Sequence, residues 1–371
     1  MSLHEDFVKA KEQVAASLIE RHTEVECLFT GLVAGEHVLL VGEPGTAKSL
    51  ILRNLVLTVS DAEGFDILMH KFLPPEELVG QVMLSKLKTD EYQRDIEGFL
   101  PTATIALLDE IWKSSPAVLN ILLTMLNERL FRNGKHMIKC PLRMAVAASN
   151  EYPIGDGYET LGALYDRFII RRNVKPVSVA RRRDLMFGKL PTITPCLTVA
   201  QIDAAQAAAS LLGWNDDAVE ALEHILSVLN SDGIRPGDRR IRKSVGVVQA
   251  FAWLNGHAQV EVEDLEILQH CLWDDPTTHS DKCRSVVCKV ANPVANSVME
   301  IINDVESIIE PINLGDLSEM GRMAEAVKKM KECEGRLAVM PKDNPRVKEG
   351  RDHIRGRIME VQRAMLGDNA A

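Results

Sequence analysis

The stretch Val38–Ser49, VLLVGEPGTAKS, decides the architecture of the first half of this chain. Four apolar residues run into a turn that contains Gly42 and Gly45, and a segment with helical apolar spacing follows from Lys48. This order predicts a buried strand, a glycine-containing loop and a helix. The spacing fits the pattern G-x-x-x-x-G-K-[ST] except at Ala47, which stands where the pattern has its second glycine. Because this position starts the helix, we expect Ala47 to keep a right-handed backbone without a positive φ.

A loop of this kind is an anion site, since its backbone N–H groups point inward and the following helix adds partial positive charge. The pattern therefore predicts a P-loop, in which Lys48 reaches the β- and γ-phosphates of a nucleotide and Ser49 ligates Mg²⁺. A plain Gly/Pro turn with an incidental lysine is the alternative, and the apolar run before the loop favours the phosphate site. The residues expected to contact the nucleotide are Gly42, Glu43, Pro44, Gly45, Thr46, Ala47, Lys48, Ser49 and Leu50.

Composition sets the broad class. The chain of 371 residues has room for two or three domains, and 46% hydrophobic with 26% charged residues is ordinary for a soluble globular protein. It contains no uninterrupted apolar run of about 18 residues and no apolar core of a signal peptide at its start, which predicts a cytoplasmic protein without a membrane span. Seven scattered cysteines and ten histidines show no metal-ligand spacing. The net charge of −10 argues against a protein that coats nucleic acid.

A second apolar run, Thr104–Glu110, ends in the adjacent carboxylates of Asp109 and Glu110. Downstream of a P-loop this is the Walker B arrangement, in which Asp109 orders the Mg²⁺ shell and Glu110 polarises the attacking water. The alternative is a helix that opens with two acids, as helices often do. The strand before the pair favours the catalytic interpretation.

Three further strands are predicted at 65–72, 143–149 and 168–174, and helical segments separate them. Five strands that alternate with helices predict an α/β fold with a parallel sheet. Asn150 follows the fourth of these strands, at the edge where ligands bind in open α/β sheets. There its amide could orient the hydrolytic water, although it could also be a plain turn residue before Tyr152-Pro153.

Two segments interrupt this alternation. Residues 130–138 predict a β-hairpin with φ > 0 at both Asn133 and Gly134, and its tip is basic. Residues 81–100 form a charged insertion, whose Tyr92 and Phe99 either line a pore or simply pack. The basic residues of the hairpin are Arg132, Lys135 and Lys139.

From Pro176 onward the pattern is helical, and it divides into two groups. Segments 198–212, 215–230, 237–256 and 261–271 form the first group, and 281–310, 315–339 and 344–366 form the second. Short connections in the second group predict a three-helix bundle. The expected domains are an αβ core at 1–176, an all-helical domain at 177–275 and the bundle at 276–371.

The motifs GEPGTAKS, LLDE, NERLFRNG, AASN, LYDRF and GDRR occur in this order, which resembles the MoxR branch of AAA+ ATPases. The stretch Asp109–Gly134 and the segment Cys271–Asp274 look most like the RavA subfamily. The resemblance is strong over residues 1–275 and weak beyond them. It implies an AAA+ core followed by an all-α lid. In that subfamily a small β-rich insertion interrupts the C-terminal bundle, and no such pattern is visible here.

The resemblance also implies roles for single residues. Lys48 and Ser49 correspond to Walker A, and Asn150 corresponds to sensor 1. Arg167 looks like the arginine finger that a subunit supplies to its neighbour's γ-phosphate, although it could simply pair with an aspartate. Arg239 looks like sensor 2, which reaches the phosphates from the lid of the same subunit, although it could be part of a solvated basic run. The adjacent Arg240 is the alternative for sensor 2.

The implied activity is hydrolysis of ATP to ADP and phosphate with Mg²⁺, in a ring of six subunits. The implied partner is a protein with a von Willebrand factor A domain, and the outcome is remodelling or activation of a client protein, with cofactor or metal insertion as one form of it. Two other classes stay open. One is a nucleic-acid-linked AAA+ motor, and the other is a nucleotide-gated scaffold with little turnover.

Overall fold

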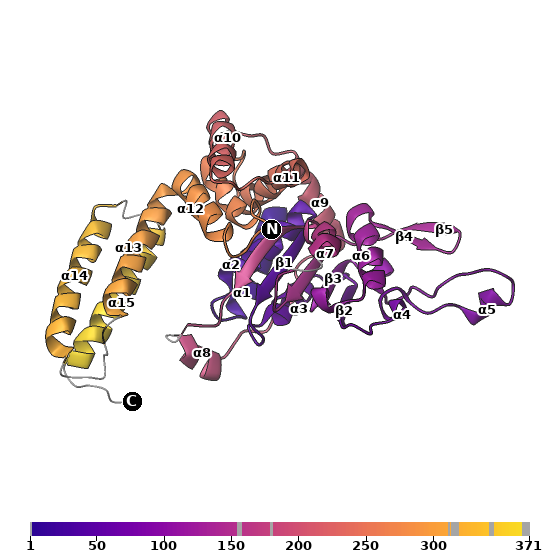
Figure 1. Cartoon of the computed structure of the whole chain (residues 1–371), viewed down its shortest axis with the longest axis horizontal. Coiled ribbons are helices and arrows are strands. Elements are labelled where there is room, and N and C mark those ends of the chain that lie inside the picture. Colours follow the sequence, from indigo (N-terminus) through magenta and orange to yellow (C-terminus); the bar gives the residue numbers. More distant parts are fainter. Residues whose placement is uncertain are drawn as a thin grey trace. The chain divides into compact units, whose positions relative to one another are not determined.

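The computed structural model describes residues 2–153, 158–178, 181–310, 312, 319–340 and 345–365. The chain forms two compact units, Met1–Arg284 and Ser285–Ala371 (Figure 1). The first unit contains both the sheet and the helices that were expected to form a lid. None of the described helices is long and apolar enough to cross a membrane.

The first unit is built on a five-stranded parallel sheet in the order β2-β3-β6-β1-β7. This confirms the predicted α/β fold with a parallel sheet. The strands end together, because Gly42 pairs with Val174, Val41 with Ser149, and Leu68 with Asp109. The strands are β1 (His37–Gly42), β2 (Gly64–Leu68), β3 (Ile105–Asp109), β6 (Met144–Ser149) and β7 (Phe168–Val174).

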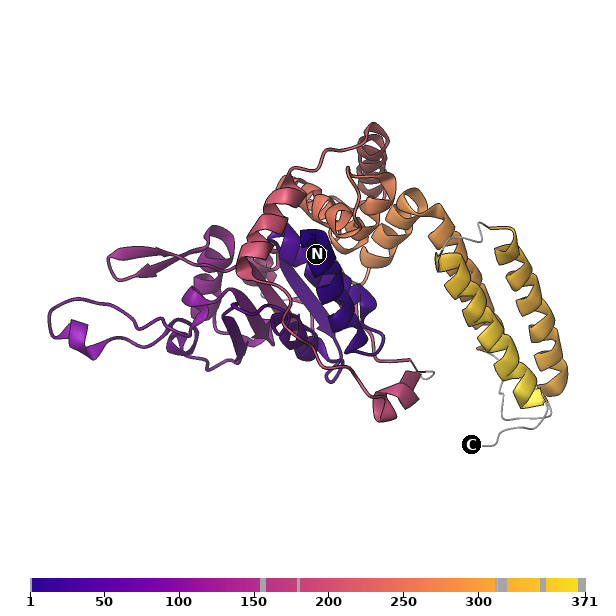
Figure 2. The same ribbon diagram turned by 180° about the vertical axis from the view of Figure 1, so that it is seen from behind.

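Helices cover both faces of this sheet, as Figures 1 and 2 show. α2 (His22–Ala34) and α3 (Lys48–Val56) contact the central strands on one face, and α1 (Leu3–Ala16) packs on both helices. On the other face, Leu39, Leu108 and Ala147 share a core with α6 (Pro116–Glu128) and α7 (Tyr158–Tyr165). Ser115 caps α6 by accepting the N–H of Val118, and proline occupies the first helical position. Short helical turns join these elements: α4 (Pro75–Val79), η1 (Leu100–Thr102) and η2 (Ile111–Lys113).

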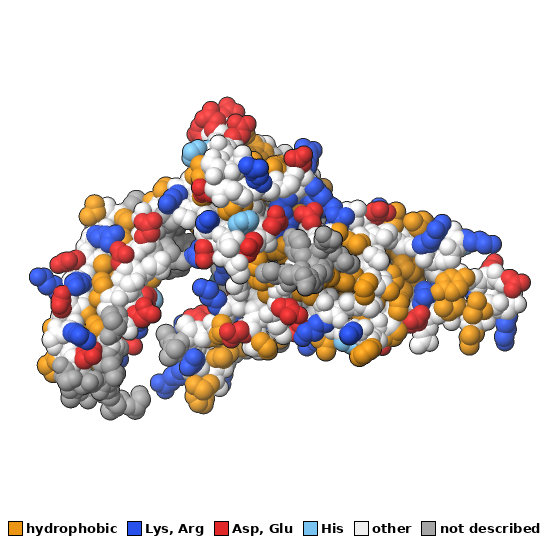
Figure 3. Space-filling view, viewed as in Figure 1, with side chains coloured by type: hydrophobic (Ala, Val, Ile, Leu, Met, Phe, Trp, Pro, Cys, Tyr) orange, Lys and Arg blue, Asp and Glu red, His pale blue; other side chains and the backbone are white. Residues whose placement is uncertain are grey.

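Two arms leave the sheet on the same side, residues 81–95 and residues 130–139 (Figure 1). The first arm folds back on itself, with Val82 paired to Arg94 and α5 (Leu84–Leu87) at its tip. The second is the predicted hairpin of β4 (Leu130–Asn133) and β5 (His136–Lys139). Figure 3 shows basic side chains over β4 and β5 and hydrophobic ones beside α5.

The turn of this hairpin differs from the prediction. Asn133 is the last paired residue of β4, and only Gly134 in the turn has a positive φ, of 61°. The Asn133 side chain is 2% exposed and pairs with the backbone of Arg94, accepting at 2.7 Å and donating at 3.0 Å. Asn133 therefore joins the two arms instead of shaping the turn. The two aromatic residues of the 81–100 insertion, which either line a pore or pack, differ in exposure: Tyr92 is 52% exposed and Phe99 is half-buried.

The remaining helices of the first unit pack beside the sheet. α11 (Asp238–Leu254) contacts α2, α9 (Val199–Ser210) and η4 (Val262–His270). α10 (Asp216–Ser231) packs on η4, and the short α8 (Arg182–Phe187) precedes the group. These bounds lie close to the four predicted helices.

In the second unit, α13 (Pro293–Ile309), α14 (Met320–Ala338) and α15 (Pro345–Met365) share one hydrophobic core. A single helix over 281–310 was wrong, because the chain breaks between α12 (Ser280–Ala291) and α13 at Pro293. Proline lacks the N–H that a continuous helix needs. The predicted helix starts at 315 and 344 and the predicted end at 366 lie outside the described residues. The described part of this unit contains helices and no strand.

Candidate functional site

The loop between β1 and α3 needs small residues for two separate reasons. A Cβ on Gly42 would lie 2.2 Å from the carbonyl oxygen of Val174 on the neighbouring strand, so only glycine fits there. Gly45 has a φ of 80°, in the left-handed region. Ala47 also lies in this region, with a φ of 67°. The expectation of a right-handed backbone at Ala47 was therefore wrong. A left-handed backbone costs an alanine more free energy than the glycine that the pattern has at this position.

The start of α3 fits a phosphate group. No side chain caps the helix at Ala47, so the first backbone N–H groups of α3 have no side-chain acceptor. Uncapped N–H groups and the helix dipole together bind anions. Within the loop, Thr46 Oγ1 donates to the carbonyl of Glu43 at 2.8 Å, which closes the turn around Pro44 and Gly45.

Lys48 lies at the centre of the site and connects the loop to β6. Its ammonium group donates to the carbonyls of Gly42 at 2.7 Å and Glu43 at 3.0 Å, and to Asn150 Oδ1 at 3.0 Å. Partial burial lowers the pKa of Lys48, and the carboxylates of Asp109 and Glu110 oppose this shift. The structure thus brings the predicted Walker A lysine and sensor 1 asparagine into direct contact.

Ser49 and Asp109 form the predicted metal pair. Ser49, at the start of α3, donates its Oγ proton to Asp109 Oδ2 at 2.8 Å, although β6 lies between β3, which Asp109 ends, and β1, which leads into the loop. A hydroxyl and a carboxylate oxygen are the hard ligands that Mg²⁺ takes beside nucleotide phosphates. The donor set therefore fits this ion, with Ser49 and Asp109 as the groups that would hold it.

Glu110 is held next to this pair in an unusual conformation. Its φ of 53° is left-handed, which is uncommon for a residue with a side chain. Asn150 Nδ2 donates to Glu110 Oε1, and Lys113 Nζ lies 3.2 Å from Glu110 Oε2 in an ion pair. A carboxylate held at the end of a strand beside the metal pair can accept a proton from a water molecule. Sequence reasoning did not single out Lys113, although its place three residues after Glu110 was visible.

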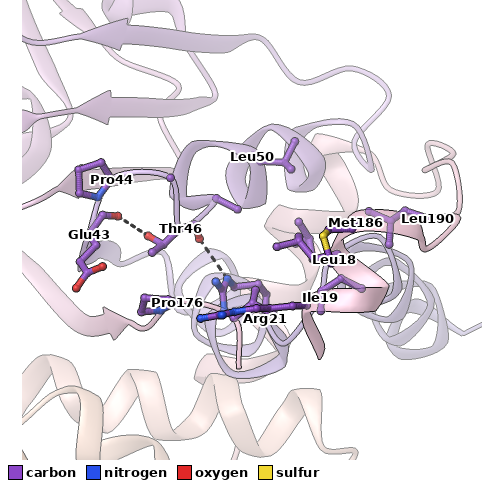
Figure 4. A pocket seen from close by; sticks show the side chains of 15 residues that line it. Leu18, Ile19, Arg21, Glu43, Pro44, Thr46, Leu50, Pro176, Met186 and Leu190 are labelled. Carbon is purple, nitrogen blue, oxygen red and sulfur yellow. Dashed lines mark hydrogen bonds between the residues drawn. The ribbon is translucent and has the colours of Figure 1, made fainter. Parts of the chain in front are cut away.

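A cavity of about 460 Å³ adjoins the loop (Figure 4). Apolar side chains from two segments line it, Leu18 and Ile19 after α1 and Met186 of α8 with the nearby Leu190. Pockets of this size and apolar lining suit a purine base. Leu50, which was expected to contact nucleotide, lines the same cavity. Apart from Leu50, none of the apolar residues outside the loop was predicted to line the site, because no local pattern marks them.

Arg21 was missed as well. It is 4% exposed and lines the cavity, where its Nε donates to the carbonyl of Thr46 at 3.2 Å (Figure 4). This hydrogen bond ties the end of the α1–α2 connection to the phosphate loop. A lone arginine before a helix carries no signal in the sequence, so only the fold reveals this contact.

The three candidate arginines lie at the opposite edge of the sheet. Arg167 directly precedes Phe168, which pairs with His37 at the start of β1. Arg239 donates to Asn127 Oδ1 at 2.7 Å. The residue before Asn127, Leu126, accepts a hydrogen bond on its carbonyl from His37 Nε2 at 2.9 Å, which places Arg239 near the start of β1. Because β1 rises about 3.3 Å per residue, its start lies roughly 17 Å from the phosphate loop. In this structure Arg239 therefore bonds Asn127 and lies far from the phosphate loop of its own chain.

Arg240 and Arg167 differ in their surroundings. Arg240 is 1% exposed and donates to Asp166 Oδ1 at 3.0 Å. Arg167 Nη1 lies 3.9 Å from Asp166 Oδ2, and its buried Nε has no hydrogen-bond partner among the described residues. A buried donor without a partner calls for an explanation, and a group from another molecule is one.

Comparisons with known proteins agree with this geometry. Residues 5–203 match a family model described as the MoxR domain in the MoxR-vWA-beta-propeller ternary systems, and residues 217–286 match an AAA lid domain. An uncharacterized protein of Methanocaldococcus jannaschii is 34% identical over 82% of this chain and 81% of its own length. Chaperone MoxR1 of Mycobacterium tuberculosis is 26% identical over 47% of this chain and 46% of its own length. A candidate ATPase of Cytophaga hutchinsonii has a similar fold, with a TM-score of 0.63 at 16% identity over 78% of this chain and 95% of its own.

Proposed function

The chain belongs to the MoxR family of AAA+ ATPases, and we propose that it hydrolyses ATP to ADP and phosphate, with Mg²⁺, as part of a ring. One observation carries the proposal: hydrogen bonds at one edge of the sheet join Lys48, Ser49, Asp109, Glu110 and Asn150, three of them between side chains and one from the backbone N–H of Glu110 to Asp109. These residues come from three strand ends, so no local motif alone accounts for their meeting. The motif order further supports a place near the RavA subfamily.

The residues divide the work as follows. The backbone N–H groups of Gly45–Ser49 and the Lys48 ammonium hold the phosphate oxygens, and Ser49 and Asp109 hold Mg²⁺, which supplies charge neutralisation when bound. Glu110 accepts a proton from the attacking water. Asn150 contacts both Lys48 and Glu110, so it keeps the phosphate-binding and water-binding groups at a fixed spacing. The cavity beside the loop takes the adenine base.

The site is incomplete within one chain. The phosphate loop and the three candidate arginines lie at opposite edges of the sheet, so any of these three that contacts the γ-phosphate would belong to a neighbouring subunit. Arg167, with its unpartnered Nε, is the proposed finger. Arg239 is the proposed second contact, and it too would act on the neighbour's nucleotide. A head-to-tail arrangement in which each subunit completes the next closes into a ring, and six subunits is the proposed number.

The proposed partner is a protein with a von Willebrand factor A domain, because the matching family model is named for systems that contain one. The two arms support action on a protein client, since Leu84, Tyr92 and Met137 are exposed there at 75%, 52% and 58%. Exposed apolar side chains grouped in one region mark interaction sites. Remodelling or activation of that client is the proposed outcome.

Subunit mixing tests the trans arrangement. We expect Arg167→Ala to bind ATP normally and to lose ~10³–10⁵ in turnover, and Glu110→Gln to bind ATP without hydrolysing it. In mixed rings about a quarter of the interfaces pair an intact Glu110 with an intact Arg167, so turnover should return in part. Mixed rings that stay inactive, although labelled subunits demonstrably exchange, would refute the trans assignment.

Nucleotide binding itself is tested by Lys48→Ala. This variant should lose the rise in melting temperature that excess ATP gives the wild type, because binding stabilises only the folded state. Lys135→Ala, on the exposed hairpin, is the control and should keep it. An unchanged ATP affinity in Lys48→Ala would remove the basis of the whole proposal.

A further inference from the structure

Arg240 is a buried cation with several hydrogen bonds at the junction between α11 and the sheet. Its Nη1 donates to the carbonyls of Ile169 at 3.1 Å and Cys271 at 2.9 Å, and its Nη2 donates to Asp166 Oδ1 at 3.0 Å. Its Nε lies 3.6 Å from Asp274 Oδ1. Both terminal nitrogens of the guanidinium thus donate hydrogen bonds inside the first unit, and Nε lies within ion-pair distance of Asp274.

These contacts engage both terminal nitrogens of Arg240, and the residue is buried, so it does not present its guanidinium to a phosphate. Arg171, which is fully buried, lies beside it and binds the carbonyl of Trp273 and the carboxylate of Asp274. The two arginines therefore share Asp274 and fix the end of η4 against the start of β7. A buried cation whose acceptors come from several elements is held in place by all of them.

Asp166 connects this cluster to the proposed finger. Arg240 Nη2 donates a hydrogen bond to Asp166 Oδ1 at 3.0 Å, whereas Arg167 Nη1 lies 3.9 Å from Asp166 Oδ2. Asp166 and Arg167 are adjacent in the chain, so a carboxylate without Arg240 would be free to form a close ion pair with Arg167. A charge-assisted pair of that kind would hold the Arg167 guanidinium against its own subunit.

We propose that Arg240 is a positioning residue for Arg167: by occupying Asp166 it keeps the Arg167 guanidinium available to the neighbouring subunit. This inference rests on the proposed role of Arg167 as a finger in trans. It also gives α11 a direct connection to catalysis in the next subunit. Displacement of α11 withdraws Arg240 from Asp166, and Asp166 then captures Arg167. A sensor that touches phosphate is a different role, and it predicts different kinetics.

A double-mutant cycle separates the two roles. We expect Arg240→Met to lower kcat at least tenfold and to leave ATP affinity unchanged, and the double variant with Arg167→Ala to be no slower than Arg167→Ala alone. If the losses multiply, Arg240 makes its own contact and the proposal is wrong. If Arg167→Ala alone keeps full turnover, the proposed finger fails instead, so the two failures can be told apart.

Arg240→Met also removes the contacts of Arg240 with two carboxylates and three carbonyls, so a gentler test is needed. Asp166→Asn keeps an oxygen for Arg240 but removes the charge that Arg167 meets, and Asp166 is partly exposed. We expect Asp166→Asn, added to Arg240→Met, to restore part of the lost kcat at an unchanged KM, because the neutral amide cannot form an ion pair with Arg167. Arg240→Lys should recover part of the activity of Arg240→Met. Equal effects on melting temperature and kcat across all three variants would indicate a purely structural role and overturn the proposal.

Mixed rings give an independent readout. Arg240→Met subunits combined with Glu110→Gln subunits should regain turnover, because the intact Arg240 and Arg167 come from the Glu110→Gln subunit. No recovery would mean that Arg240 serves the nucleotide of its own chain, which contradicts the proposal. Arg242→Met, on the exposed side of the same helix, is the matched control and should retain wild-type kcat.

Discussion

Ser49 Oγ lies 2.8 Å from Asp109 Oδ2, and these two residues are 60 positions apart in the chain. The contact forms because β1 and β3 end at the same edge of the sheet with only β6 between them. It places a hydroxyl and a carboxylate where one Mg²⁺ can bind both. We therefore expect Mg²⁺ binding to be sensitive to substitution of either residue.

Asp109→Asn should remove the dependence on Mg²⁺. We expect wild-type ATPase activity to disappear with a chelator and the variant to lose at least about 100-fold in turnover, since charge neutralisation at the phosphates supplies several kcal/mol. Calorimetric ATP binding with and without Mg²⁺ measures the same effect directly. Asp66→Asn, which breaks only an exposed ion pair with Arg53, is the control. A variant whose ATP affinity still rises with Mg²⁺ would place the ion elsewhere.

The cavity beside the loop should contribute to the affinity for ATP by binding its adenine base and not its phosphates. Met186→Asp puts a charge on its apolar wall, so we expect ATP to bind roughly tenfold more weakly while tripolyphosphate binds as before. Competition of the two ligands against a fluorescent nucleotide measures the difference. Phe187→Asp is the matched control, since Phe187 is 77% exposed on the same helix and does not line the cavity. Equal losses in both variants would show that the base binds at another place.

Asn133 should hold the two arms together. It is 2% exposed and its amide makes both hydrogen bonds with the backbone of Arg94, so Asn133→Ala leaves two groups unpaired at a cost of about 1–3 kcal/mol. We expect trypsin to cut faster after Lys86 and Lys88, while ATP binding stays the same. Met137→Ala, at an exposed position of the same hairpin, should leave the cleavage rate unchanged. Identical cleavage of the two variants would argue against a joint between the arms.

The phosphate loop and the parallel sheet could be predicted from sequence because their signals are local. Apolar runs define the strands, and the spacing of Gly42, Lys48 and Ser49 defines the loop within eight residues. The backbone of Ala47 could not be predicted in the same way. Its left-handed φ follows from the path that the loop must take between β1 and α3, and the residue type alone favours the opposite.

The two adjacent arginines show where sequence reasoning reaches its limit. Arg239 and Arg240 stand next to each other in one basic run, and either could have been the sensor. In the fold, Arg240 is enclosed by groups from β7 and from the end of η4, whereas Arg239 reaches Asn127 at the end of α6. The acceptors of Arg240 lie at least 31 positions away, so no local pattern distinguishes the two residues.

His37 should make the fold sensitive to acid. It is buried at the start of β1, where Nδ1 accepts the N–H of Ala145 at 3.0 Å and Nε2 donates to the carbonyl of Leu126 at 2.9 Å. An imidazole that accepts at one nitrogen is neutral. Burial, with Arg129 nearby, accordingly lowers the pKa of His37 well below its ordinary value. Burial also lowers the pKa of His270, to about 3, so that residue acts in the same direction.

The sign of the effect follows from proton binding. Below about pH 6.5 the unfolded chain protonates His37 and the folded chain does not, so stability is full above that pH and falls as pH decreases, by up to ~1.4 kcal/mol per pH unit. His37→Gln offers a donor and an acceptor but does not titrate, so it should lose less stability between pH 7.5 and pH 5.5. Urea unfolding followed by tryptophan fluorescence measures both differences. His136→Gln, on the exposed face of the hairpin, should keep the wild-type pH dependence. If His37→Gln loses as much stability as the wild type over this range, His37 is not a source of the acid sensitivity.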